Sequence, residues 1–541
     1  MTRVPLWLVA ASYTVLTLFF ASPLVNYTHL SDASYPGDAR LLMWTLAWDS
    51  HALLTGTPLF EANMFHPAKQ ALTWTEHHFG MAIFGLPVYA ATGNPALTYW
   101  LLWLLSFPLN ALAMHALAWR LTRDHRAAAA AGIVFGFCFF RMHHGHGHLQ
   151  LLWTWPLPLI PLAIERWLGK PTTQRTVLVT ALVLLQALTS WYLAVFAALL
   201  SLITAAALVK RRELAFAHLR HAASALAVAA AVLGWFARPY FELQTPGVTE
   251  AFESSADAAA YLLPPENTWP GQWLLAHTTW KPRWIWGEQT LYVGSAAIAL
   301  AVVALWALSR RRTVRACRLT VALLITGAVA LLLSWGPTSS GVAPFDLLAR
   351  LPGMSMFRSP ARFALLVMLT LATLAAYGAA HLMRVYGRTG VSLVVLLTAA
   401  FLGESFLINF PGGKPMPFTV PPVYRHLPSL PAGAVLSLPS YRGSPEGFRE
   451  ADYLLYSTVH WSPVANGFGR HEPVEHRDNL QAMIRFPASE AVTRLRKLGI
   501  RYVIVHTARD TRLREAVAAA EKHPDIEMVR RFGEDYIYRV R

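Results

Sequence analysis

Residues 361–383, which read ARFALLVMLTLATLAAYGAAHLM, contain one charged side chain, that of Arg362. A helix needs about 17–25 mainly apolar residues to cross the hydrocarbon layer of a bilayer, and this stretch meets that requirement. Similar apolar stretches recur through the first 409 residues, so the sequence predicts a polytopic α-helical membrane protein with about eleven transmembrane helices. The predicted spans lie near residues 5–25, 95–118, 127–142, 149–168, 175–190, 191–209, 220–237, 291–308, 319–335, 361–383 and 390–409.

The overall composition agrees with this prediction. The chain has 541 residues, of which 55% are hydrophobic and 14% charged, and its mean hydropathy is +0.37. Soluble domains are about one quarter charged, so the composition excludes an ordinary cytosolic enzyme and a disordered scaffold. Cys138 and Cys317 lie in or beside apolar runs, which supports neither a disulfide framework nor a cysteine zinc site.

The charged residues divide the chain into two parts. Residues 410–541 hold 33 of the 76 charged side chains, and residues 1–409 hold the rest. Within 410–541, the stretches 434–438 and 501–506 are rich in Val, Ile and Leu, whereas 490–498 and 511–522 have helical patterns. We therefore predict a transmembrane domain at 1–409 and a small C-terminal α/β domain at 410–541.

Basic residues also predict the topology. If Arg3 is cytoplasmic and the spans alternate, 18 of the 27 basic residues before residue 410 fall on the cytoplasmic side. The net charge of +16 is then mostly a topology signal, which argues against a nucleic-acid partner. This model places the N-terminus in the cytoplasm and the C-terminal domain on the outer side. The predicted outer loops are 26–94, 141–148, 238–290 and 336–360.

The first outer loop contains candidate catalytic residues. Asp38 follows the first span and could accept a proton from an acceptor hydroxyl, although an aspartate before a helical pattern is also a common helix cap. Glu76 stands beside His77 and His78, and these three offer either metal ligands or an acid/base pair. Exposed loop histidines without any such role are also common.

The turn at 141–148, RMHHGHGH, places four histidines and an arginine between two spans. Ionisable residues at membrane depth are costly and usually functional. Arg141, His146 and His148 could bind a phosphate, or the imidazoles, His144 among them, could ligate a divalent cation with Glu76 or Asp38. An ordinary polar turn at the bilayer interface is the alternative.

Two further outer segments carry candidate binding residues. Glu288 could bind a sugar hydroxyl or a cation and Trp286 could stack on a sugar ring, but a helix cap and a membrane-interface tryptophan explain them equally well. Arg358 and Arg362 lie at the outer end of a span, against the positive-inside trend. They are suited to clamp a phosphate, or else they extend to lipid headgroups.

These motifs resemble the GT-C superfamily of integral-membrane glycosyltransferases, and most closely its poorly characterised bacterial members. The resemblance implies a polyprenyl-phosphate-linked sugar donor, an acidic catalytic residue in the first outer loop, and often a divalent metal cation. Asp38 matches the catalytic position. A second acidic motif is missing between Asp124 and Glu165, and Glu76 or Glu288 could replace it. The motifs are Gly37-Asp38, 63–67 (NMFHP), 76–78 (EHH), 141–150, 357–363 (FRSPARF), 456–461 (YSTVHW), 466–467 (NG) and 498–505 (LGIRYVIV).

The resemblance therefore implies an inverting hexosyl- or pentosyltransferase at the outer face of a bacterial inner membrane. Its acceptor would be a glycan, a lipid or a protein. A transporter or flippase of lipid-linked saccharides is a second hypothesis, but it predicts repeated halves with broken helices, which the sequence lacks. A non-catalytic envelope-assembly protein is a third, and the missing acidic motif is its main support.

Overall fold

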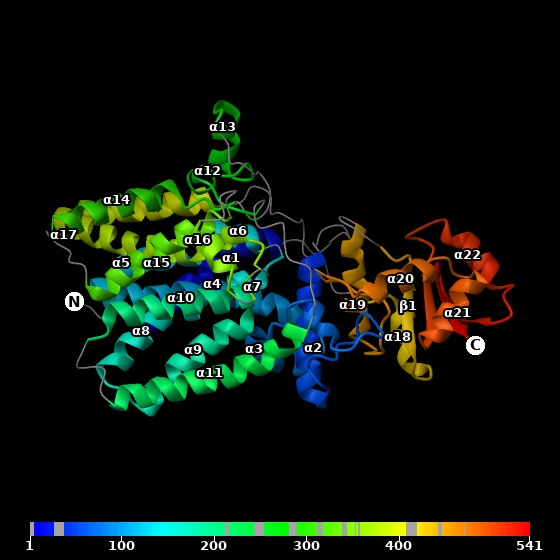
Figure 1. The fold of residues 1–541 in the computed structure, drawn as a ribbon. Helices are drawn as coiled ribbons and strands as arrows, with labels where there is room; N and C mark the ends of the chain where they lie inside the picture. Colours follow the sequence, from blue (N-terminus) through cyan, green and yellow to red (C-terminus); the bar gives the residue numbers. More distant parts are fainter. Residues whose placement is uncertain are drawn as a thin grey trace. The chain divides into compact units, whose positions relative to one another are not determined.

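The computed structural model is mostly helical (Figure 1) and divides into two compact units. The first unit comprises Met1–Tyr27 and Leu101–Gly413, and the second comprises Thr28–Trp100 and Lys414–Arg541. The structure describes residues 5–25, 37–145, 147–210, 216–242, 254–280, 288, 290–310, 317–337, 343–351, 353–354, 357–406, 419–441, 446–469 and 471–541.

The first unit is built from long apolar helices, and α8 to α11 run side by side in Figure 1. Its helices are α1 (Leu6–Val25), α4 (Pro95–Thr122), which begins in the second unit, α5 (His125–Gly136), α6 (Phe139–His144), α7 (Leu149–Leu152), α8 (Pro156–Gly169), α9 (Thr173–Thr189), α10 (Trp191–Leu208), α11 (Phe216–Glu242), α12 (Ala258–Leu262), α13 (Trp269–His277), α14 (Ser295–Ser309), α15 (Arg318–Ser334), α16 (Pro344–Ala349), the 3₁₀ turn η5 (Pro360–Phe363) and α17 (Ala364–Ser405).

Among the described residues, five helical segments are long and apolar enough to cross a membrane. They are Pro95–Thr122, His125–His144, Trp191–Leu208, Phe216–Glu242 and Pro360–Ser405. Shorter apolar helices occur at Leu6–Ala21, Phe79–Thr92, Thr173–Thr189, Ser295–Ser309 and Arg318–Ser334. The protein is therefore a multi-pass membrane protein, and the count of eleven spans stays a prediction.

The last two predicted spans form one helix, α17, with a break at Gly387. This residue has φ 55° and ψ −122°, a backbone conformation that glycine adopts at little cost. α17 therefore consists of two apolar helical segments that meet at Gly387 without a loop between them.

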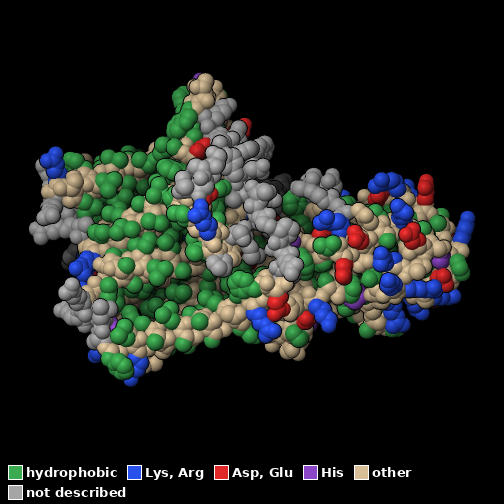
Figure 2. All heavy atoms as spheres, viewed as in Figure 1, with side chains coloured by type: hydrophobic (Ala, Val, Ile, Leu, Met, Phe, Trp, Pro, Cys, Tyr) green, Lys and Arg blue, Asp and Glu red, His purple; other side chains and the backbone are tan. Residues whose placement is uncertain are grey.

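The surface of the first unit is that of a protein solvated by lipid. Figure 2 shows hydrophobic side chains over the visible face of its long helices, with Lys and Arg gathered near their ends. Leu202 and Leu226, in the middle of α10 and α11, are both 70% exposed. Apolar surface of this extent is stable in a bilayer and a liability in water.

The second unit combines a mixed sheet with short helices. Its strands follow the order β1-β2-β4-β3, with β1 parallel to β2 and the other neighbours antiparallel. The elements are α2 (Gly37–Thr55), η1 (Ala71–Trp74), α3 (Phe79–Thr92), α18 (Pro422–His426), η6 (Leu427–Ser429), β1 (Ala434–Leu438), η7 (Glu446–Arg449), α19 (Glu450–Ser457), α20 (Val474–Met483), α21 (Ser489–Lys497), β2 (Ile500–His506), α22 (Leu513–Ala520), β3 (Ile526–Phe532) and β4 (Asp535–Val540).

The second unit differs from the predicted division at residue 410, because residues 28–100 belong to it as well. Backbone hydrogen bonds explain this grouping. The amides of Phe65 and His66 donate to the carbonyls of Asn466 (3.0 Å) and Val464 (2.9 Å), and the Val464 amide donates to the Asn63 carbonyl (2.8 Å). Val464 in turn bridges to β1 through Val435. The first predicted outer loop thus extends the edge of the C-terminal sheet.

Candidate functional site

The first unit contains a buried ion pair between Glu288 and Arg362. The Arg362 Nε donates to both carboxylate oxygens of Glu288, at 3.1 and 3.0 Å, and its Nη2 donates to Oε1 at 2.5 Å. The two side chains are 16% and 6% exposed. Burial alone would raise the pKa of Glu288, but Arg362 and then His144 outweigh burial and hold this pKa well below its usual range. The carboxylate is therefore ionised at neutral pH.

Tyr192, at the start of α10, braces this ion pair. Its ring lies under the Arg362 guanidinium, 4.5 Å from the ring centroid. Its hydroxyl accepts hydrogen bonds from the backbone amides of Arg358 (3.0 Å) and Ser359 (3.1 Å). Tyr192 thereby fixes both the side chain of Arg362 and the backbone of the segment that leads to it.

Two histidines of the 141–148 turn complete the cluster. The Nδ1 atoms of His144 and His148 lie 3.0 Å apart, so one ring donates a hydrogen bond to the other. The Nε2 of His144 lies 4.0 Å from Oε2 of Glu288. We call His144, His148, Glu288 and Arg362 the polar cluster. It joins one carboxylate, one guanidinium and two imidazoles inside an apolar helical unit.

Arg141 anchors this turn to the segments that precede and follow it. Its guanidinium donates to the carbonyls of Phe135 (2.7 Å) and Leu152 (3.1 Å) and to the Thr154 hydroxyl (2.7 Å). Trp103 of α4 adds a hydrogen bond to the Gly145 carbonyl at 2.9 Å. These bonds give the buried Arg141 a structural role in shaping the turn.

The polar cluster also has the ligand types of a metal site. Ligand atoms of His144, His148 and Glu288 lie within 4.8 Å of one another, and Zn²⁺ accepts such a donor set. Arg362, however, engages both oxygens of Glu288, and its positive charge would repel a cation there. The arrangement therefore disfavours a cation at this carboxylate. Among the described residues, His77 and His78 join no such group.

In the second unit, Asp38 lies in the first turn of α2. Residues from the C-terminal part of the chain pack against this helix. A Cβ on Gly37 would lie 2.6 Å from the Phe448 ring, so α2 meets the residues before α19 in close contact. Arg40 forms a buried ion pair with Asp452 of α19, which also pairs with Arg509 at 3.3 Å. These contacts fix the position from which Asp38 projects.

A second carboxyl group of α2, that of Asp49, is fully buried. Neither of its oxygens has a hydrogen-bond partner within standard geometry among the described residues. Burial raises the pKa of Asp49 to about 8, and the backbone of His78 only partly offsets this effect. Burial also lowers the pKa of His77 to about 3, so both groups are neutral at pH 7. Glu76 is half-buried beside them.

The structure thus brings together four predicted site residues from three distant segments: His144, His148, Glu288 and Arg362. Arg358 contributes through its backbone at the same segment. Asp38, Glu76, His77 and His78 belong to the second unit. His146 and Trp286 lie outside the described residues.

The prediction assigned no role to Tyr192, Asp49 or Asp452. Only Tyr192 had a sequence signal, because it follows the polar Ser190 at a break between two apolar runs.

Solved structures of one protein share this fold at a low level of identity. The arabinofuranosyltransferase AftD from Mycobacteria is 16% identical, with a TM-score of 0.54 over all of this chain and 40% of AftD. A mutant of AftD gives 14% identity and a TM-score of 0.59 over all of this chain and 42% of AftD. ArnT from Cupriavidus metallidurans is 11% identical over 98% of both chains, with a TM-score of 0.46.

The chain spans about two fifths of the length of AftD, and the likeness between the two is one of fold. None of the curated proteins matches the chain. A family model described as "Domain of unknown function (DUF6311)" matches residues 54–402, which are more than half of the sequence. The chain therefore belongs to the DUF6311 family.

Proposed function

We propose that the protein is a membrane glycosyltransferase that transfers a sugar from a polyprenyl-phosphate-linked donor to a glycan, lipid or protein acceptor. The observation that carries this proposal is the polar cluster, buried in a helical unit whose fold AftD shares. Burying these ionisable groups within apolar helices is costly, and such residues usually line a substrate path. A phosphate on a lipid carrier is a ligand that would reach them.

The donor phosphate would bind at the polar cluster. Arg362 would be its main contact, because Glu288 and Tyr192 hold the guanidinium in one orientation before any ligand arrives. Glu288 neutralises part of this charge, so Arg358 and the imidazoles of His146 and His148 would supply further donors. Arg141 would act indirectly by shaping the turn.

Asp38 would act as the general base. It would take the proton of an acceptor hydroxyl while that oxygen forms a bond to the anomeric carbon of the sugar. The bond from this carbon to the phosphate oxygen would break, and polyprenyl phosphate would leave with the electron pair. Attack opposite the leaving group inverts the anomeric centre. Glu76 is the alternative carboxylate, and Trp286 would stack on the sugar ring.

The remaining predictions complete the proposal. The protein would lie in a bacterial inner membrane with its N-terminus in the cytoplasm, and transfer would occur at the outer face. The membrane domain at 1–409 would bind the donor, and residues 410–541 would contribute to acceptor binding outside the membrane.

The role of Asp38 can be tested by sugar transfer in membranes that contain the protein. Labelled polyprenyl-phosphate sugars serve as donors, and label in acceptors is measured. Replacing a general base costs about 10²–10⁴ in rate, so Asp38→Asn should lose nearly all transfer. Asp38→Ser repeats the test with a smaller side chain, which like asparagine can cap a helix and lacks a base.

The matched control is Asp257→Asn, since Asp257 caps α12 through the Ala260 amide and belongs to neither candidate site. This variant should transfer sugar at the wild-type rate. Undiminished transfer by Asp38→Asn, or full activity of Asp38→Ser, would exclude Asp38 as the base.

A further inference from the structure

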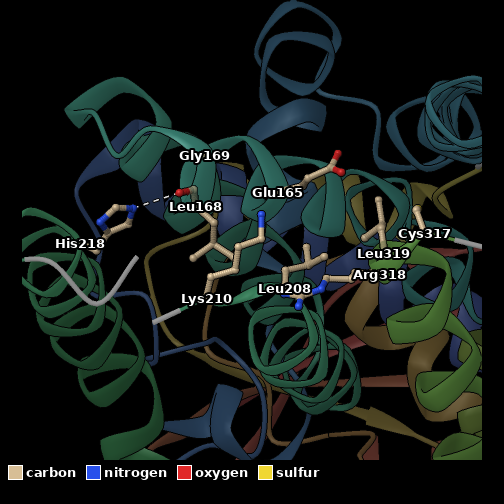
Figure 3. Close-up of a pocket in the computed structure, with 9 residues that line it drawn as sticks. All are labelled: Glu165, Leu168, Gly169, Leu208, Lys210, His218, Cys317, Arg318 and Leu319. Atoms are coloured by element: carbon tan, nitrogen blue, oxygen red, sulfur yellow. Dashed lines mark hydrogen bonds between the residues drawn. The ribbon is translucent and has the colours of Figure 1, made fainter. Parts of the chain in front are cut away.

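The first unit has a cavity of about 460 Å³ at the ends of α8, α10, α11 and α15 (Figure 3). Two polar side chains at this cavity join helices to one another. Glu165 pairs with Arg120 at 2.8 Å, and the His218 Nε2 donates to the Leu168 carbonyl at 3.0 Å. These bonds tie α8 to α4 and α11, which is a structural use of the side chains. A surface better suited to a ligand lies in the second unit.

That surface is formed by the stacked rings of His51 and Trp461, which we call the ring pair. His51 lies near the end of α2, and Trp461 follows α19 after a short turn. The ring centroids are 4.3 Å apart and the ring planes are inclined by 17°. The buried ring of Trp48 packs against Trp461 at 5.6 Å and 62°. Both members of the ring pair are half-buried, so a packed support carries an accessible aromatic surface.

Trp461 has a backbone conformation that is unusual for a bulky residue. Its φ is 51°, and its amide donates to the Ser457 carbonyl at 2.7 Å to close the last turn after α19. Glycine is the usual residue at such a left-handed position after a helix, because it has no Cβ. A tryptophan there is strained, and strained residues of this kind cluster at ligand sites. The conformation therefore favours a binding role for the Trp461 ring.

Asn63 holds the turn on both sides of Trp461. Its Nδ2 donates to the Ser457 hydroxyl at 3.0 Å and to the Ser462 carbonyl at 3.1 Å. Its Oδ1 accepts a hydrogen bond from the Trp44 Nε1 at 3.3 Å. The ring pair is thus oriented before any ligand arrives, which lowers the entropic cost of binding.

The chemistry of the ring pair suits an uncharged ligand with C–H groups on one face and hydroxyls at its rim. The face of an indole ring is electronegative and attracts positively polarised C–H groups. The Trp461 Nε1 and both ring nitrogens of His51 make no hydrogen bond with any residue that the structure describes. Burial lowers the pKa of His51, so its imidazole is mostly neutral at pH 7 and can both donate and accept. A sugar ring has this combination of groups.

We propose that the ring pair binds one sugar residue of a glycan. The apolar face of the sugar would pack on the exposed surface of the ring pair, and its hydroxyls would bond to His51 and the Trp461 Nε1. This inference rests on the proposed function only in naming that glycan as the acceptor. From Asp38 to His51 the axis of α2 rises about 20 Å. The ring pair would therefore hold a part of the acceptor that is remote from the reacting hydroxyl.

The proposal can be tested by saturation-transfer NMR on the purified protein in a detergent without a sugar headgroup. The probes are the methyl glycosides of glucose, galactose, mannose and arabinose, titrated without any donor. Trp461→Gly removes the ring and supplies the residue that best suits this backbone conformation, so the turn should persist. We expect this variant to bind the recognised glycoside about tenfold more weakly, because truncating a buried aromatic anchor commonly costs that much.

Two further variants refine the test. His51→Phe keeps a stacked ring and removes both ring nitrogens, so it should weaken binding by less than Trp461→Gly does. The matched control is Trp74→Gly, the same change at another half-buried tryptophan of the second unit. This control should bind the glycosides as the wild type does.

A transfer assay separates this inference from the proposed function. Where sugar transfer occurs, Trp461→Gly should raise the acceptor KM about tenfold and leave the donor KM unchanged. Because the NMR titration contains no donor, it does not depend on catalysis. Glycoside binding by a protein that transfers no sugar would support the ring pair and contradict the proposed function instead.

Four results would overturn the inference. Binding of none of the four glycosides would exclude a sugar site, and equal affinities of the wild type and Trp461→Gly would place that site elsewhere. An equal loss in Trp74→Gly would show that the change disturbs the unit as a whole. Dihexanoyl phosphatidylcholine that displaces the glycosides and depends on Trp461 more strongly would assign the ring pair to the membrane surface.

Discussion

Breaking the Glu288–Arg362 ion pair should destabilise the first unit far more than breaking an exposed pair. Glu288→Gln keeps the size of the side chain and removes its charge, which leaves the Arg362 guanidinium buried without its carboxylate. Loss of one partner from a buried ion pair costs about 3–5 kcal/mol. Because the Glu288 side chain is 16% exposed, we expect the low end, about 3 kcal/mol.

The measurement is thermal unfolding of the purified protein in detergent, followed by tryptophan fluorescence. Glu288→Gln, Arg362→Met and the double variant form a cycle, and the double variant should lose clearly less than the two single losses combined. The matched control is Glu534→Gln, which breaks a pair with Arg514 at 3.0 Å in which the side chains are 51% and 63% exposed. That change should cost less than about 1 kcal/mol.

The pH dependence gives an independent check. Since the folded pKa of Glu288 is held below its unfolded value, the stability from this pair is present above about pH 4.5 and is lost as the pH falls below it. The difference between wild type and Glu288→Gln should therefore stay constant from pH 5 to pH 8. Additive losses in the cycle, or a loss no larger than that of the control, would refute the reasoning.

Three further predictions concern the second unit and the metal question. Because burial raises the pKa of Asp49 to about 8, folding of the wild type becomes less favourable as the pH rises from about 4 to 8. Melting curves at pH 5 and pH 8 should therefore show that Asp49→Asn is stabilised relative to the wild type, and more so at pH 8. Gly37→Ala should lower sugar transfer at least tenfold, because the added Cβ would displace α2 and Asp38 from Phe448. Gly403→Ala should leave transfer unchanged, because the space around a Cβ at this position is open. Transfer should survive EDTA, because Arg362 engages the Glu288 carboxylate; a loss that Mn²⁺ or Zn²⁺ restores would contradict this.

The apolar helices could be predicted from the sequence because each is a local property of one continuous stretch. The polar cluster could not be predicted as one site. His144, Glu288 and Arg362 are more than 70 residues apart from one another, and their local motifs separately predicted a metal ligand, a sugar- or cation-binding residue and a phosphate-binding residue. No local sequence pattern predicts that Arg362 pairs with Glu288 or that Tyr192 lies beneath the Arg362 guanidinium.

The packing of the first outer loop could not be predicted either, because its contacts join residues that are distant in the sequence. Arg40 pairs with Asp452, and Asn63 donates to the Ser457 hydroxyl, at sequence separations of 412 and 394 residues. The charges of the C-terminal part had the proportions of an ordinary soluble surface. Two of the described ones, Glu450 and Asp452, are in fact buried, and Asp452 pairs with Arg40 of the first outer loop.

The central claim, sugar transfer from a polyprenyl-phosphate donor, is tested most directly in proteoliposomes of the purified protein. A mixture of polyprenyl-phosphate-linked sugars and a membrane extract as acceptor is supplied, and mass spectrometry follows donor and free polyprenyl phosphate. We expect one donor to disappear with release of an equal amount of polyprenyl phosphate, and Asp38→Asn to abolish this release. A donor that crosses the bilayer intact, or remains unchanged in every mixture, would contradict the account.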